Sequence, residues 1–154
     1  TTPSGRSKRV PESAPDAVAS WQCELGRTLL GSTRSGVYDF LRAAGVDSEC
    51  VERSVVALDE LVTNAVEHAG SRCELWVSVR RRWVRISVHD WAPVDFSGRW
   101  FRPGRQSGLA LVARLSAQLF LQPAHRGKYV VALVPRWRRG EPEWPIPAAL
   151  QLPF

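Results

Sequence analysis

The sequence has no long apolar stretch, and none of its hydrophobic runs approaches the roughly 20 residues that a membrane-spanning helix needs. Its first residues, TTPSGRSKRVPESAPD, contain no apolar core and do not have the form of a signal peptide. Their polar composition predicts a disordered tail over residues 1–16. We therefore expect a cytoplasmic protein that does not enter a membrane.

Cysteine is scarce, and Cys23, Cys50 and Cys73 are widely spaced. No CxxC pair occurs, so the pattern does not indicate a structural zinc site. An odd number of cysteines also argues against a disulfide-stapled scaffold. We expect all three thiols to be reduced and mostly buried.

Negative charge is in the minority, and the chain carries a net charge of +6. Its cationic residues, nearly all arginine, gather in two clusters: Arg80, Arg81, Arg82 and Arg85, and then Arg136, Arg138 and Arg139. Basic clusters can bind nucleic acid. No nucleic-acid-binding motif accompanies these two, so we favour the interpretation that they are solvated turns and tails and keep nucleic-acid binding as the lesser alternative.

The length of 154 residues corresponds to about one domain. We place that domain at residues 17–136, between the tail and a proline-rich C-terminal tail at 137–154. Apolar periodicity predicts strands at 18–27, 73–79, 83–90 and 128–135, helices at 29–45, 48–69 and 108–119, and a long loop at 91–107. This order predicts an α+β two-layer sandwich, with helices on one face of a mixed, mostly antiparallel sheet.

The long helix, which contains ALDELVTNAVEHAG, has two different faces. Its apolar stripe consists of Val51, Val55, Leu58, Val62, Ala65 and Val66. On the opposite side lie Glu60, Asn64, Glu67 and His68, and Gly70 ends the helix.

Glu60 and Asn64 are four residues apart and therefore lie side by side on this helix. An amide oxygen suits Mg²⁺, which usually keeps several waters and bridges phosphates. A glutamate one turn earlier can take a proton from water or a hydroxyl group. For an isolated ExxxN, a solvated helix face is the more common explanation.

Two further positions add to this pair. Asp90 ends a predicted strand, where its carboxylate could accept a hydrogen bond from an exocyclic amine such as that of adenine. Gly108 opens a predicted helix, whose free N–H groups could bind phosphate. Each feature alone is weak, and their order and spacing together indicate a nucleotide site.

The stretches ALDELVTNAVEHAG, VRISVHDWAP and GRQSGLALVARLSAQL, with GKYVVALVP after them, resemble the motif series of the GHKL, or histidine-kinase-like, ATPase fold. The chain is most similar to the anti-sigma factor serine kinases of that fold, in particular actinobacterial ATP-binding regulators. The resemblance covers roughly residues 18–135 and is most specific in its first stretch.

The resemblance implies ATP and Mg²⁺ as cofactors and assigns a role to each motif. Glu60 would be the catalytic base, Asn64 the Mg²⁺ ligand and Asp90 the ligand of the adenine amino group. The loop 91–107 would form an ATP lid. The adenine motif continues into Ala92, and the phosphates would meet Ser107, Gly108 and Leu109. In this family the kinase sequesters a sigma factor and phosphorylates a serine of an anti-anti-sigma protein.

The chain departs from the family pattern at three positions. Ala92 and Gln106 replace motif glycines, and Tyr129 stands where a Gly-x-Thr pattern would place a threonine near adenine, after Gly127. These departures leave two functions open: an ATP-dependent serine kinase, or a protein-binding module on the same fold that no longer needs nucleotide. The exposed face of the sheet, with Trp76, would permit a homodimer without requiring one.

Five other side chains allow two readings. His68 either lines the pocket or, as we prefer, meets the negative end of the helix dipole. The loop aromatics would either cover a nucleotide or partner, or pack locally to hold the loop: Trp91, Phe96, Trp100 and Phe101.

Overall fold

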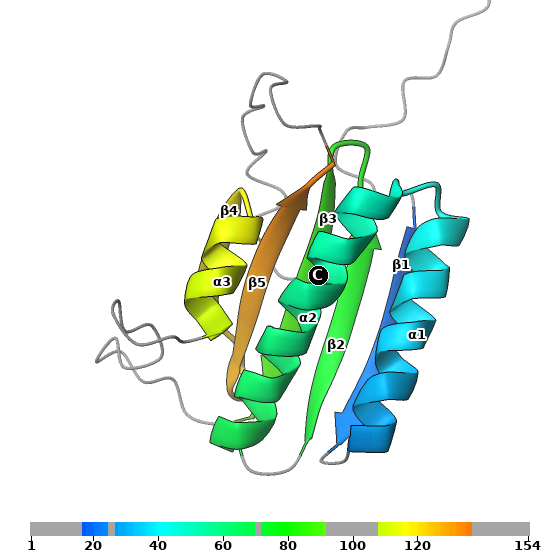
Figure 1. Ribbon diagram of the computed structural model, residues 1–154. Helices are drawn as coiled ribbons and strands as arrows, with labels where there is room; N and C mark the ends of the chain where they lie inside the picture. Colours follow the sequence, from blue (N-terminus) through cyan, green and yellow to red (C-terminus); the bar gives the residue numbers. More distant parts are fainter. Residues whose placement is uncertain (1–16, 25–26, 70–71, 92–107, 137–154) are drawn as a thin grey trace, which may run out of the picture.

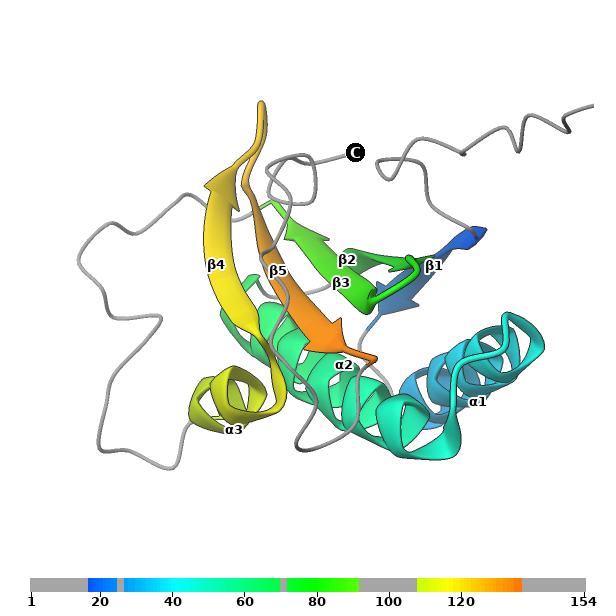
Figure 2. The same cartoon turned by 90° about the horizontal axis from the view of Figure 1, so that it is seen from above.

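The computed structural model describes residues 17–24, 27–69, 72–91 and 108–136. Within them the elements are β1 (Ala17–Glu24), α1 (Arg27–Ala43), α2 (Ser48–Ala69), β2 (Arg72–Val79), β3 (Trp83–Asp90), α3 (Gly108–Leu115), β4 (Gln118–Pro123) and β5 (Lys128–Pro135). The strand order is β1-β2-β3-β5-β4, and all four neighbouring pairs are antiparallel. The three helices cover one face of the sheet (Figures 1 and 2). The predicted two-layer α+β fold is confirmed.

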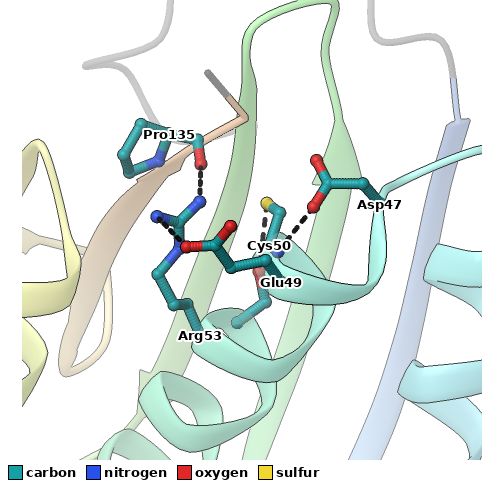
Figure 3. A network of polar contacts seen from close by, with 6 residues as sticks. Asp47, Glu49, Cys50, Arg53 and Pro135 are labelled. Carbon is teal, nitrogen blue, oxygen red and sulfur yellow. Dashed lines mark hydrogen bonds and ion pairs between the residues drawn. The ribbon is translucent and has the colours of Figure 1, made fainter. Parts of the chain in front are cut away.

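Helix α2 lies at the centre of the helical layer and packs against α1, α3 and the sheet. Most of the predicted apolar stripe is fully buried, and Val55 and Val66 are partly buried against the same core. Leu61 joins the stripe with 1% of its surface exposed. The carboxylate of Asp47 caps the start of α2, where its Oδ1 accepts a hydrogen bond from the Cys50 backbone N–H at 3.1 Å (Figure 3).

Arginine side chains form hydrogen bonds between several segments at the end of the molecule that contains the start of α2. Arg53 donates to the Pro135 carbonyl at 3.0 Å and reaches Glu49 at 4.0 Å (Figure 3). Arg136 donates to the backbone carbonyls of Arg80 and Gly45. These bonds connect the end of β5 to the β2–β3 turn and to the α1–α2 connection.

The interpretation of the first arginine cluster as a solvated turn was wrong at two positions. Arg80 is 8% exposed and Arg85 is 1% exposed, whereas Arg81 is exposed as expected. Burial, followed by the nearby charge of Arg80, lowers the pKa of Arg85 to about 10. β3 is a central strand with both faces largely buried, so its alternation does not mark a solvated side. Arg138 and Arg139 lie outside the described residues.

The helix predicted over 108–119 was too long, and a strand was missed. Helix α3 ends at Leu115, and β4 begins at Gln118 and pairs with β5. Leu115 and Leu119 are four residues apart, which imitates a helical repeat. In the strand, Leu119 and Leu121 pack against the main core while Phe120 packs on the other face. A short apolar run of this kind does not distinguish helix from strand.

All three cysteines are free and buried, as predicted. Cys23 and Cys73 are direct partners in the β1–β2 register, and Cys50 contacts Ser54 at 3.9 Å. Burial raises the pKa of the Cys50 thiol. Cys50 therefore stays protonated at neutral pH and acts as a small core residue.

No helix in the described ranges is long and apolar enough to cross a membrane.

Gly31 offers a simple stability test in α1. A Cβ added there meets no heavy atom within 4 Å. Gly31→Ala is therefore expected to raise the free energy of unfolding by about 0.5–1 kcal/mol, because alanine loses less conformational freedom in a helix than glycine does. Urea denaturation measures the change. At Gly36 the added Cβ would lie 3.0 Å from Nε1 of Trp21, so Gly36→Ala should gain less. An equal gain at both positions would contradict the expectation.

Candidate functional site

The candidate site begins on the side of α2 that carries Glu60 and Asn64. Both side chains are half-buried, whereas Glu67 further along the helix is exposed. Leu61 and Ala65, the residues after each of them, belong to the core. The pair therefore lies at the boundary between core and solvent. A polar side chain in such a position can contact a ligand without losing its packing.

Four chain segments meet at the same end of the molecule. The C-terminal end of α2, the end of β3, the start of β5 and the start of α3 all lie at the lower end in Figure 1. Helix α2 packs directly against both α3 and β3. The fold thus brings the three sequence motifs, which are far apart in the chain, to one edge of the sandwich.

Asp90 ends β3 and is almost completely buried, with 1% of its surface exposed. It alternates in phase with Ile86 and Val88, so its side chain is on the helix-facing side of the sheet. Its Oδ1 lies 2.8 Å from Nζ of Lys128, which is also buried. Asp90 and Lys128 are direct partners in the β3–β5 register. The candidate adenine ligand is therefore half of a buried ion pair.

The placement of Tyr129 near adenine was wrong, and Lys128 is the residue beside Asp90. Successive strand residues point to opposite faces, so Tyr129 points away from the helices. Its ring stacks on His89, with centroids 4.5 Å apart and an angle of 22° between the planes. Tyr129 thus belongs to the second, smaller cluster on the far face of the sheet. No local pattern indicated Lys128, because its position depends on the register of β5 against β3.

Gly127 makes this placement possible. Its φ is +77°, and a Cβ built there would lie 1.9 Å from the carbonyl oxygen of Asp90 and 2.6 Å from Cα of Trp91. Only glycine fits such a contact between backbones. Because of this close approach, the β4–β5 turn packs against the end of β3, and Lys128 lies next to Asp90.

Helix α3 begins at Gly108, as predicted. Its first turn has no acidic residue that would repel an anion. The side chain of Leu109 is 2% exposed and packs in the core, so only its backbone N–H could meet a phosphate. The start of α3 could therefore offer backbone N–H groups to a phosphate.

Several candidate residues lie outside the described part of the chain. They include Ala92, Gln106, Ser107, the lid aromatics Phe96, Trp100 and Phe101, and the side chain of His68. Trp91, at the start of the predicted lid, is described; it is 44% exposed, and its ring lies 4.5 Å from that of His89. His89 in turn donates a hydrogen bond from Nε2 to the Arg126 carbonyl at 2.7 Å.

Asn64 on α2 has an amide oxygen that a phosphate-bound cation could use as a ligand. Within the described ranges, no group of three or more His, Cys, Asp or Glu side chains could hold a metal ion. Mg²⁺ commonly takes one or two protein ligands and completes its shell with waters and substrate phosphates. The amide oxygen of Asn64 fits that role.

The family model described as "Histidine kinase-like ATPase domain" matches residues 26–133. This range includes Glu60, Asn64, Asp90 and Lys128. A search of the curated proteins found no match.

Proposed function

The chain belongs to the histidine kinase-like ATPase family, and we propose that it is an ATP-binding anti-sigma regulatory factor of the serine protein kinase type. In this proposal it sequesters a sigma factor. It also phosphorylates a serine of an anti-anti-sigma antagonist and thereby prevents that antagonist from releasing the sigma factor.

The observation that carries the proposal is the meeting of three segments at one end of the sandwich. Glu60 and Asn64 are half-buried on α2, β3 ends there in Asp90, and α3 begins there, where the first backbone N–H groups of a helix have no partner within the helix. An extended ligand with a phosphate end and a base end would suit this arrangement. Phosphoryl transfer requires mostly positioning and charge neutralisation, which such a site can supply.

Each residue has one task in this scheme. Asn64 would hold Mg²⁺, which neutralises charge on the phosphates. Glu60, one helical turn earlier, would accept the proton of the attacking serine hydroxyl. The N–H groups at the start of α3 would bind phosphate oxygens.

A specific observation supports a second candidate function. The ion pair between Asp90 and Lys128 already occupies one oxygen of the carboxylate that would contact adenine. A chain that binds its partner without nucleotide could keep this fold and this pair. The second candidate is therefore a nucleotide-independent protein-binding module that regulates transcription by sequestering its partner.

Isothermal titration with Mg-ATP separates the two candidates. The wild-type chain is expected to release heat on binding. Asn64→Ala is expected to bind Mg-ATP about 10- to 100-fold more weakly, the size of one lost contact to a charged group. Glu52→Ala, at an exposed position near the start of the same helix, should bind like the wild type.

Two outcomes would decide against the kinase. No heat at high micromolar ATP would contradict nucleotide binding. Equal affinity of Asn64→Ala and the wild type would contradict the role of Asn64. If a purified sigma factor or antagonist then binds equally well without ATP and to Glu60→Ala, the binding module is the better description.

A further inference from the structure

Lys128, the buried ion-pair partner of Asp90 at the base end of the site, has no role in the scheme above. Lys128 Nζ and Asp90 Oδ1 are 2.8 Å apart, and their side chains are 11% and 2% exposed. Both lie on the helix-facing side of the sheet, at the end where α2, β3, β5 and α3 meet. A buried ion pair is rarely worth its desolvation as a stabilising contact alone. Its position at this end of the molecule suggests that the pair makes hydrogen bonds to a ligand.

The two members of the pair have complementary hydrogen-bonding capacity. A carboxylate only accepts, whereas an ammonium group only donates and carries three N–H donors. One of those donors serves Asp90 Oδ1. The pair therefore offers an acceptor and a donor within one hydrogen-bond length of each other.

A purine base presents one hydrogen-bond donor and one acceptor side by side, at position six and at N1, and their order depends on the base. Adenine presents an amino donor at position six beside the acceptor N1. A six-keto purine presents an oxygen acceptor beside the donor N1–H. An isolated carboxylate suits the amino group and repels the keto oxygen. With an ammonium group beside it, each edge finds one donor and one acceptor. Because their order is reversed between the two kinds of base, the base moves along its edge so that its acceptor meets Lys128 and its N–H meets Asp90.

We infer that Lys128 is a specificity-determining residue that, with Asp90, makes the site accept six-keto purine nucleoside triphosphates as well as ATP. This inference rests on the proposed function, since it assumes that the nucleotide base lies beside Asp90. Lys128 would donate to the keto oxygen of such a base and to N1 of adenine, while Asp90 accepts the remaining N–H.

The test compares ATP with inosine triphosphate, which differs from ATP only at the six position and at N1. Isothermal titration of the wild-type chain with the Mg²⁺ complex of each is expected to give affinities within about threefold of each other, because the base edge loses no hydrogen bond. Lys128→Met should weaken the binding of inosine triphosphate about tenfold or more relative to the binding of ATP. Lys128→Arg keeps a charged donor and should keep the two affinities close.

Lys128→Met also removes the ion-pair partner of a buried carboxylate, so each variant is first checked by circular dichroism and thermal melting. Lys128→Gln retains an N–H donor for Asp90 and protects the fold. It loses the charge, so the affinity for ATP relative to that for inosine triphosphate should still rise severalfold. A purely structural role of Lys128 would change both affinities equally and leave the ratio unmoved.

The outcomes separate this inference from the proposed function. The inference is overturned, and the kinase proposal stands, if the wild type binds ATP about tenfold or more tightly than inosine triphosphate. It is also overturned if the ratio of the two affinities is the same in Lys128→Met and Lys128→Gln as in the wild type. If neither triphosphate binds the wild-type chain, the proposed function fails, and the inference fails with it.

Discussion

Gly127→Ala is expected to destabilise the fold by about 3 kcal/mol or more, the largest effect that we expect from removing or adding one methyl group. Two costs combine. The backbone of Gly127 has a φ of +77°, where alanine is strained. The new Cβ would also lie 1.9 Å from the Asp90 carbonyl oxygen, and both neighbours are backbone that cannot rotate away.

Gly45→Ala provides the matched control for this prediction. Gly45 has nearly the same φ, +80°, but a Cβ added there meets nothing within 4 Å. Its replacement should therefore cost only the conformational strain, about 1–2 kcal/mol. Equilibrium denaturation of both variants gives the difference, which isolates the contact with β3. Equal losses at the two positions would mean that the turn before β5 moves freely away from the end of β3.

This contact matters to the site as well as to the fold. Gly127 precedes Lys128 directly, and its close approach to β3 fixes where Lys128 starts β5. A less damaging replacement there would be expected to shift Lys128 relative to Asp90. The arrangement of the Asp90–Lys128 pair thus depends on the close backbone approach at Gly127.

Helix α2 shows which features can be predicted from sequence alone. Its predicted range, Ser48–Ala69, agrees with the structure at both ends. The information is local, because the apolar repeat continues over many turns and a glycine follows the last one. The same repeat separated the face of Glu60 and Asn64 from the core side. The relation between those two residues was therefore predictable, since it depends only on helical spacing.

The missed features depend on contacts between distant segments. Strand β4 is six residues long and lies at an edge of the sheet, and its first apolar residue, Leu119, was read as part of the helix before it. Whether Lys128 or Tyr129 faces Asp90 is decided by a one-residue shift in register between β3 and β5. Local patterns in the sequence do not contain that register.

Arg85 shows a third limit. Alternation along β3 predicted one face on the core and one polar face that was either solvated or covered, and Arg85 and Ser87 on the polar face are 1% and 0% exposed. Alternation gives the two faces of a strand but not what covers each of them. The burial of Arg85 also removes it from any basic surface. That leaves the nucleic-acid alternative with fewer of the arginines on which it was based.

Glu60→Gln is expected to lower the rate of phosphoryl transfer about 100-fold or more while Mg-ATP still binds. Glutamine has almost the same shape as glutamate but cannot accept the proton of the attacking serine. The half-buried position of Glu60 should accommodate it without a change in fold. The measurement is phosphoserine formation on a purified anti-anti-sigma substrate, followed by mass spectrometry, together with titration of Mg-ATP.

Glu52→Gln makes the same chemical change on the same helix at an exposed position near its start. It should leave both transfer and binding unchanged, which controls for the loss of one negative charge on α2. If Glu60→Gln transfers phosphate as fast as Glu52→Gln, Glu60 is not the base. Because serine attack needs a proton acceptor close to the γ-phosphate, the acceptor would then lie on another segment at this end of the sandwich. A loss of ATP binding in Glu60→Gln alone would instead make Glu60 a binding residue, and the position of Asn64 one turn away would explain why.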